Sequence, residues 1–95
     1  MDKQPCVYIM TNWKDEVLYV GVTSNLKGRV YQHKHALLRG FTAHYNVKKL
    51  VYFEMFGDMY LAICREKQLK AWRRQKKIDL VNQMNPEWRD LYDDL

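Results

Sequence analysis

Two strand-like segments lie close together near the N-terminus, and they limit the folds open to this chain. Residues 5–11 and 17–23 are rich in Val, Ile, Tyr and Thr, which favour strands, and the five residues between them are mostly polar. A connection this short joins antiparallel neighbours, because parallel strands need a much longer crossover. The sequence therefore predicts a hairpin, with Tyr8 on its first strand and Tyr19 on its second.

A basic helix is expected to follow the hairpin. Ser24 or Asn25 can cap it, and its apolar stripe runs to about Leu38, with Gly40 as the stop. Residues 41–47 are expected to form a polar loop.

The second half of the chain predicts one more strand and two helical stretches. Residues 49–56 are strand-like, and Asp58 can cap a long helix over residues 59–77, beyond which an apolar periodicity continues. Pro86 suits the first turn of a final amphipathic helix over residues 86–95, docked on the core. The predicted order is β-β-α-β-α-α-α in a single domain of residues 1–95, because 95 residues can bury only one core.

The charge of the chain is unevenly distributed. The total is +5, but residues 87–95 hold four acidic residues and one basic residue, so the first 86 residues carry a net +8. A body with this excess attracts polyanions such as nucleic acid. No apolar run approaches a membrane span and the N-terminus lacks a secretory signal, so a cytoplasmic location is expected. Cys6 and Cys64 lack the spacing of a zinc site or a disulfide framework, and both are expected to be small buried residues.

The motifs of this chain resemble the GIY-YIG nuclease domain. The resemblance rests on Val7-Tyr8, on Tyr19-Val20-Gly21, on Arg29 in the next helix and on Glu66 in the helix after the third strand. Further segments are similar to the small stand-alone bacterial branch of that family, whose members are described as endonucleases. These segments are Gly40-Phe41-Thr42, residues 50–54, residues 65–70, Trp72-Arg73-Arg74 and residues 85–91.

The resemblance implies an α+β domain with a central three-stranded antiparallel sheet flanked by helices. It also implies an enzyme that cuts phosphodiester bonds with one divalent cation, Mg²⁺ or Mn²⁺. Our leading hypothesis is an endonuclease for DNA in repair, directed by substrate structure rather than sequence; DNA is favoured over RNA, and the sequence leaves that choice open. The implied catalytic residues are Tyr8, Tyr19, Arg29, His33 and Glu66, with Glu66 as the metal ligand. These types suit the reaction, because one carboxylate is enough for Mg²⁺ and a guanidinium offers forked donors to phosphate. A phenol has a reference pKa of about 10, so forming tyrosinate at pH 7 costs about 4 kcal/mol unless nearby cations lower the pKa.

Each of these residues also has a structural interpretation. Glu66 can simply pair with Lys70 four residues later, and His33 falls on an apolar stripe where a packed histidine is common. A run of basic residues can track phosphates or remain a solvated helix face, with Trp72 either an aromatic wedge or part of the core. The run consists of Lys67, Lys70, Arg73, Arg74, Lys76 and Lys77.

Two departures from the family pattern leave catalytic competence open. Cys6 stands where glycine is frequent, and Val22 stands where repair nucleases of the family often have lysine. The alternative to a nuclease is a catalytically weak nucleic-acid-binding module, or a docking subunit of a repair or RNA-processing assembly, on the same fold.

Overall fold

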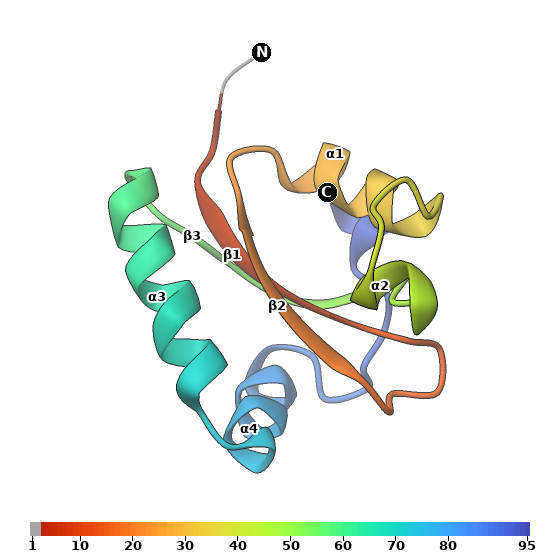
Figure 1. Cartoon of the computed structure of the whole chain (residues 1–95). Coiled ribbons are helices and arrows are strands. Elements are labelled where there is room, and N and C mark those ends of the chain that lie inside the picture. The colour runs from red at the N-terminus through yellow and green to blue at the C-terminus, as the bar shows by residue number, and fades with distance from the viewer. Residues whose placement is uncertain (1–2) are drawn as a thin grey trace.

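The computed structural model describes residues 3–95, so the first two residues of the expected domain lie outside the described part. The elements confirm the expected α+β class and the three predicted strands, and Figure 1 shows α3 and α4 on one side of the strands and α1 on the other. The strands are β1 (Cys6–Thr11), β2 (Leu18–Thr23) and β3 (Lys49–Met55). The helices are α1 (Leu26–Lys34), α2 (Phe41–His44), α3 (Met59–Ala71) and α4 (Arg74–Met84), followed by the 3₁₀ turn η1 (Tyr92–Asp94).

The sheet has three strands in the order β2-β1-β3, and both pairings are antiparallel. The predicted hairpin joins β1 to β2 through a loop that one side chain organises. Oδ1 of Asn12 accepts the backbone N–H of Glu16 at 2.8 Å and of Val17 at 3.3 Å. These bonds satisfy backbone donors that the turn would otherwise leave unpaired.

Because the strand order is β2-β1-β3, β2 is an edge strand of the sheet. The candidate site lies along this strand.

Side chains of the central strand alternate between two cores. Tyr8 and Met10 pack with Val30 of α1, whereas Val7 and Ile9 pack with residues of α3 and α4. This alternation follows from the period of two in a strand. It puts Tyr8 between the sheet and α1.

The first helix ends earlier than the sequence predicted. α1 stops at Lys34 rather than near Leu38, because Ala36 adopts a φ of 53° and the N–H of Leu37 bonds to the carbonyl of Gln32 at 2.9 Å. This pattern terminates helices and usually uses glycine, so an alanine in this conformation gave no sequence signal. The expected loop over residues 41–47 contains the four-residue helix α2.

The expected long helix over residues 59–77 is divided in two. α3 ends at Ala71, and Trp72 and Arg73 have extended backbone before α4 begins. The bend lets Leu69 of α3 and Val81 of α4 enter the same buried cluster. In a straight helix these two residues, twelve positions apart, would point about 120° away from each other around the axis.

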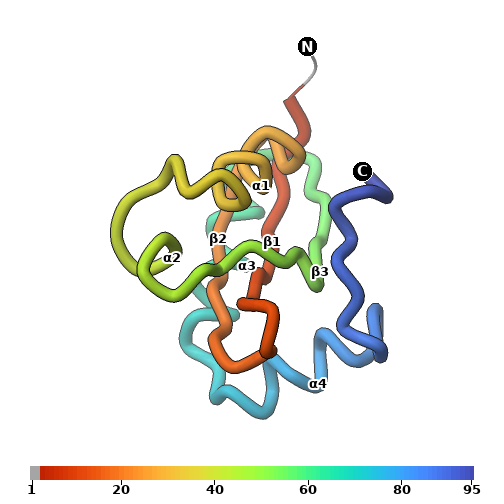
Figure 2. Tube along the Cα trace, turned by 90° about the vertical axis from the view of Figure 1, so that its right-hand side faces the viewer, coloured from red at the N-terminus to blue at the C-terminus, as the bar shows by residue number. Residues whose placement is uncertain are grey.

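The final segment is docked as expected, but the predicted helix over residues 86–95 is wrong. Figure 2 shows this segment running beside β3 with only a short turn near its end. Asn85 donates to the carbonyl of Arg89 at 2.7 Å and accepts the N–H of Arg89 at 3.1 Å, and the N–H of Leu91 bonds to the carbonyl of Leu50 at 2.8 Å. These bonds satisfy the backbone in an extended path and so replace helical bonds.

The two cysteines differ in their surroundings. Cys6 is buried, and burial raises the pKa of its thiol to about 11, whereas Cys64 is exposed on α3, contrary to expectation. Among residues 3–95, no helix is both long enough and apolar enough to cross a membrane.

Candidate active site

Tyr8 lies at the centre of the candidate site because its ring crosses the neighbouring strand. It is fully buried on β1, and Gly21 is its partner on β2. A Cβ atom on Gly21 would lie 2.3 Å from Cζ and 2.4 Å from the hydroxyl oxygen of Tyr8. Glycine allows this close approach because it has no side chain. The glycine of the second motif therefore makes room for the tyrosine of the first, whose hydroxyl reaches over the edge strand.

A histidine and a second tyrosine lie around this phenol. Nε2 of His33 is 3.1 Å from the hydroxyl oxygen of Tyr8, and His33 is 3% exposed. The ring centroid of Tyr19 is 6.3 Å from that of Tyr8 and 5.5 Å from that of His33. Three titratable rings are thus in mutual contact between β1, β2 and α1.

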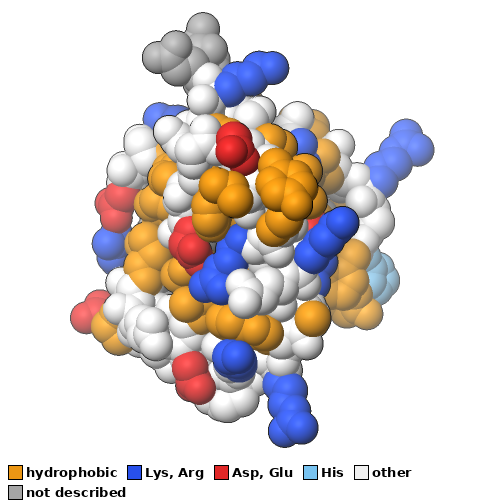
Figure 3. Space-filling view, turned by 90° about the vertical axis from the view of Figure 1, so that its left-hand side faces the viewer, with side chains coloured by type: hydrophobic (Ala, Val, Ile, Leu, Met, Phe, Trp, Pro, Cys, Tyr) orange, Lys and Arg blue, Asp and Glu red, His pale blue; other side chains and the backbone are white. Residues whose placement is uncertain are grey.

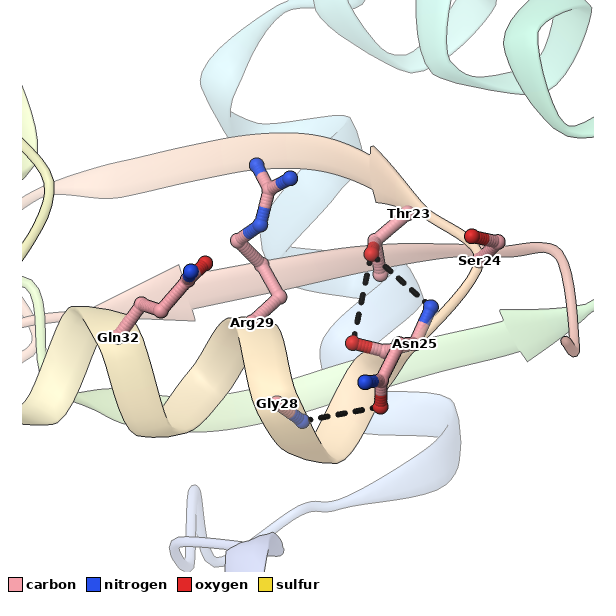
Figure 4. Close-up of a pocket in the computed structure, with 6 residues that line it drawn as sticks. All are labelled: Thr23, Ser24, Asn25, Gly28, Arg29 and Gln32. Carbon is pink, nitrogen blue, oxygen red and sulfur yellow. Dashed lines mark hydrogen bonds between the residues drawn. The ribbon is translucent and has the colours of Figure 1, made fainter. Parts of the chain in front are cut away.

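Arg29 is the fourth member, and α1 positions it one turn before His33. Oδ1 of Asn25 caps this helix by accepting the N–H of Gly28 at 3.1 Å. Figure 4 shows the Arg29 side chain extending from α1 toward β2, and its guanidinium interacts with the phenol of Tyr8. Arg29 lines two shallow pockets of about 260 Å³ and 350 Å³. We call the set Tyr8, Tyr19, Arg29 and His33 the tyrosine cluster.

Burial keeps the inner members of the tyrosine cluster uncharged. It raises the pKa of the Tyr8 phenol well above its usual range, Tyr19 adds to the rise, and Arg29 opposes it. Burial, followed by the charge of Arg29, lowers the pKa of His33 to about 4. At neutral pH the bond between Tyr8 and His33 therefore joins two neutral groups. Nδ1 of His33 has no hydrogen-bond partner within the described part of the chain.

Glu66 approaches from the other face of the sheet. It lies on α3, in the stripe whose buried members are Ala62 and Leu69. Its carboxylate is 3.0 Å from Nζ of Lys70, and its side chain is 15% exposed. Among the described residues, Glu66 has no hydrogen bond or ion pair with the tyrosine cluster. Of the five predicted catalytic residues, four are thus in direct contact and Glu66 is not.

Helix geometry places Glu66 and its neighbour Arg65 on different flanks of α3. Nε of Arg65 is 3.0 Å from Oε2 of Glu54, so this flank of α3 faces β3. Successive helical residues are about 100° apart, so Glu66 lies on a different flank of α3 from Arg65. α3 packs against β2 and β1. Glu66 and the helical members of the tyrosine cluster, Arg29 and His33, therefore lie on helices that pack against opposite faces of the sheet.

The donor set fits a hard cation that keeps part of its water shell. Residues 3–95 contain no group of three or more His, Cys, Asp or Glu side chains that could hold a metal. Structural zinc needs four protein ligands, whereas Mg²⁺ binds through one or two carboxylates and completes its shell with water and substrate phosphate. Glu66 is a carboxylate of this kind, and Lys70 is its competing partner.

The basic run is divided between two helices rather than forming one continuous face. Figure 3 looks onto the side of the molecule that bears α3, and it shows basic side chains mixed with acidic and hydrophobic ones. Trp72 packs against the core, with Nζ of Lys76 4.2 Å from its ring centroid. Trp72 is therefore partly buried at the edge of the core rather than a fully exposed wedge. Lys67 and Lys70 lie on α3, Arg73 precedes α4, and Arg74, Lys76 and Lys77 lie in its first turn.

Phe41 is a pocket residue that was not among the predicted site residues. Phe41 lies in the segment expected as a loop, yet its ring is stacked with that of Tyr19, with centroids 6.4 Å apart and planes at 26°. Both rings line the larger pocket together with Arg29. The available signal was the spacing of Phe41 and Tyr45, because residues four apart meet on one face of a helix.

A comparison with known families agrees with this geometry. Residues 4–79 match the family model of the GIY-YIG catalytic domain. The chain belongs to the GIY-YIG family. The GIY-YIG match spans the whole tyrosine cluster and Glu66, so the resemblance drawn from the motifs is confirmed. Membership of this family indicates nuclease activity and interaction with nucleic acid. GIY-YIG nucleases generally use a divalent metal ion.

Individual relatives of this GIY-YIG chain carry the name UPF0213. A UPF0213 protein of Clostridium perfringens is 38% identical over 76 residues, which cover 80% of this chain and 81% of the relative. One of Staphylococcus saprophyticus is 34% identical over 83 residues, covering 87% and 99%. The solution NMR structure of a UPF0213 protein of Bacillus halodurans has a TM-score of 0.58 at 23% identity, covering 92% of each chain. This last likeness supports the fold.

Proposed function

We propose that this GIY-YIG domain is a metal-dependent endonuclease that hydrolyses phosphodiester bonds in DNA, directed by the structure of the substrate rather than by its sequence. The observation that carries the proposal is the tyrosine cluster at the edge strand. There the Tyr8 hydroxyl lies 3.1 Å from His33, beside Arg29 and Tyr19, which both border an open pocket. Proton-transfer groups next to a phosphate-binding group are what phosphodiester hydrolysis requires.

Arg29 is the group suited to bind the scissile phosphate. Its planar guanidinium offers several donors in a fixed fork, which matches the nonbridging oxygens of a phosphodiester. It borders the pocket and contacts Tyr8, so its position is restricted before substrate binds. A restricted donor stabilises developing charge without a reorganisation cost at the moment of reaction.

The difference in burial between the two tyrosines favours Tyr19 as the general base. Its phenol would first release its own proton to solvent, and the tyrosinate would then take a proton from the attacking water. Tyr8 is fully buried, and the pKa of its phenol lies well above the usual range. It cannot meet a water molecule without local opening. Tyr19 is partly exposed and lines the pocket with Arg29. Tyr8 and His33 then act as positioning residues that hold the ring of Tyr19 and the guanidinium of Arg29.

Glu66 is the residue that would hold the cation. Mg²⁺ or Mn²⁺, when bound, polarises a phosphoryl oxygen and stabilises the leaving oxygen. The ion pair between Glu66 and Lys70 competes only weakly with cation binding. Lys70 is 52% exposed, and exposed ion pairs contribute about 1 kcal/mol or less to stability. Glu66 therefore remains available as an oxygen ligand.

The test is cleavage of a substrate panel by wild type and Glu66→Ala. The panel contains duplex, nicked, branched and single-stranded DNA, with RNA counterparts, in Mg²⁺ or Mn²⁺. Glu66→Ala should lose cleavage yet keep or gain affinity for nucleic acid, since the variant also removes a charge that repels phosphate. Glu87→Ala is the matched control, because it removes the same charge from an exposed residue outside the site.

The result also separates the nuclease from the alternative function. If wild type binds nucleic acid but gives no metal-dependent product with any substrate, the domain is a binding module or a docking subunit of a repair or RNA-processing assembly. Equal cleavage by wild type and Glu66→Ala would remove Glu66 from the reaction and leave the tyrosine cluster as the whole site.

A further inference from the structure

A series of aromatic rings leads from Tyr19 to the molecular surface. The centroid of Phe41 is 6.4 Å from that of Tyr19 and 4.7 Å from that of Tyr45. Phe41 is 49% exposed, and Tyr45 is 46% exposed. Trp13, which is 58% exposed, lines a further pocket of about 250 Å³ together with Tyr45. We call Phe41, Tyr45 and Trp13 the aromatic platform.

Buried neighbours and a backbone hydrogen bond anchor the turn that carries Phe41 and Tyr45 of the platform. Thr42 and Val47 are buried on either side of Tyr45, and the N–H of Val47 donates to the carbonyl of Thr42 at 2.9 Å. Phe41 and Tyr45 are four residues apart on α2 and its C-terminal cap, so both rings project from one anchored turn. Neighbouring large apolar side chains on an anchored surface mark interaction sites more often than scattered single ones do.

Basic residues accompany the rings. Arg29 and Arg39 line the pocket between Tyr19 and Phe41, and Lys14 lines the pocket between Trp13 and Tyr45. Rings that stack on bases, next to cations that follow a phosphate backbone, are the combination by which proteins bind single strands. In a duplex the faces of each base are covered by its neighbours, so only an unpaired base can stack on a protein ring.

We propose that the aromatic platform binds unpaired bases adjacent to the phosphodiester at Arg29, so that the substrate is single-stranded nucleic acid or a single-stranded branch. The platform continues directly from Tyr19 of the tyrosine cluster, and the strand thus runs from the reacting phosphate across α2 toward the hairpin loop. This inference rests on the proposed function for the position of the reacting phosphate. Bases of DNA and of RNA offer the same stacking face.

Binding measured in EDTA tests the platform without any cleavage. The probes are a fluorescein-labelled single strand of about 12 nucleotides, a length within the range of known single-strand sites, its RNA counterpart, and a blunt hairpin duplex of the same composition. The variant is Phe41→Leu with Tyr45→Leu, which keeps apolar bulk but removes the aromatic faces. Tyr60→Leu is the control, because Tyr60 is a 74% exposed tyrosine on α3 outside the platform.

The expected result is tighter binding of the single strands than of the duplex by wild type. The double variant should weaken single-strand binding by about 10- to 100-fold and leave duplex binding unchanged, while Tyr60→Leu changes neither. Circular dichroism and the melting temperature check that the variants fold. Equal affinity of wild type for duplex and single strand, equal weakening of both by the double variant, or no binding of any probe would overturn the proposal.

Cleavage in Mg²⁺ separates the two proposals. Loss of single-strand affinity in the double variant, with no cleavage of any substrate by wild type, supports the platform and contradicts the nuclease. Duplex cleavage that is as fast as single-strand cleavage, and is unaffected by the double variant, supports the nuclease and contradicts the platform. A protein partner on these rings would instead leave nucleic-acid binding unchanged in the double variant.

Discussion

Gly21 is important because its lack of a side chain leaves room for the ring of Tyr8. A strand residue normally projects a side chain at this position, yet here the ring of the paired tyrosine lies across it. The ring thereby extends from the central strand over the edge strand, where its hydroxyl meets His33 and Arg29. The tyrosine of the first motif can therefore adopt its position only because the second motif has glycine at Gly21.

Replacing this glycine should therefore damage the site and the core together. In Gly21→Ala the new methyl group would overlap the Tyr8 ring, so we expect a loss of roughly 1–3 kcal/mol in the free energy of unfolding. Cleavage should fall by about 100-fold or more as Tyr8 leaves its position. Urea denaturation and cleavage assays measure the two effects. Gly57→Ala is the control, since a Cβ atom on Gly57 meets nothing within 4 Å; if both variants behaved like wild type, the close approach of Tyr8 would have no consequence.

His33 should make stability depend on pH. The folded protein holds the pKa of His33 at about 4, whereas an unfolded histidine titrates near 6.5. Between these values the unfolded chain binds a proton that the folded chain does not, so stability is fully present above pH 6.5 and falls as the pH is lowered toward 4. The loss should reach roughly 2–3 kcal/mol.

Urea unfolding at several pH values between 7 and 4 measures this dependence. In His33→Gln the histidine contribution should disappear, so the difference from wild type narrows as the pH falls. His44→Gln, at an exposed histidine, should keep the wild-type dependence. Parallel curves for wild type and His33→Gln would show that His33 does not titrate in the expected range.

At the level of the elements, local patterns sufficed for the strands and for most of the cluster. The three strands and their hairpin follow from composition and a short polar connection. Arg29 and His33 share a helix face because they are four residues apart, and this contact could be expected from sequence. The register that brings Tyr8 opposite Gly21 depends on how two strands pair. The sequence motifs therefore indicated that these residues belong to one site, but not that the Tyr8 ring lies over Gly21.

The helix ends could not be predicted because long-range contacts decide them. The bend at Trp72 lets two helices share one sheet face, which no local periodicity reveals. After Pro86 an apolar spacing typical of a helix is present, yet Asn85 and Asp90 use their side chains to bond backbone groups of β3. Amphipathic spacing was thus a correct guide to which residues are buried, such as Leu91, but not to their secondary structure.

Asp90 should be the strongest single attachment of this final segment. Its Oδ1 accepts the N–H of Leu50 and the N–H of Tyr92, each at 3.1 Å, and its other oxygen pairs with Lys34 of α1. Asp90→Ala leaves these donors unpaired and should lower the free energy of unfolding by roughly 2–3 kcal/mol. Asp90→Asn keeps one acceptor and should cost less.

Chemical denaturation of both variants checks this order. Asp93→Ala is the control, because Asp93 is a neighbouring exposed aspartate. Equal losses for Asp90→Ala and Asp93→Ala would mean that the segment is held by Leu91 burial and its backbone bonds rather than by the side chain of Asp90.

At the scale of the whole molecule, we expect two groups of arginines to attract phosphate. Arg29 and Arg39 accompany the tyrosine cluster, and Arg73 and Arg74 lie exposed where α3 turns into α4. The second group adjoins the β1–β2 loop, which also carries Trp13 of the aromatic platform, since Nη2 of Arg74 is 3.5 Å from the carbonyl of Asp15. A strand bound over the platform could therefore continue to the α3–α4 bend.

This arrangement predicts how salt should act on binding. Each phosphate contact adds about 0.7–0.9 to the slope of log affinity against log salt, so Arg73→Glu with Arg74→Glu should reduce the slope by roughly two units. The loss of affinity should be similar for unrelated sequences, because phosphate contacts carry no base information. Binding titrations in EDTA at several salt concentrations measure the slope. Lys3→Glu is the control, because it reverses the charge of an exposed residue far from this bend. An unchanged slope would restrict the nucleic-acid interface to the tyrosine cluster and the aromatic platform, and would leave Lys67, Lys70, Lys76 and Lys77 as solvated charges of the helices that support the sheet.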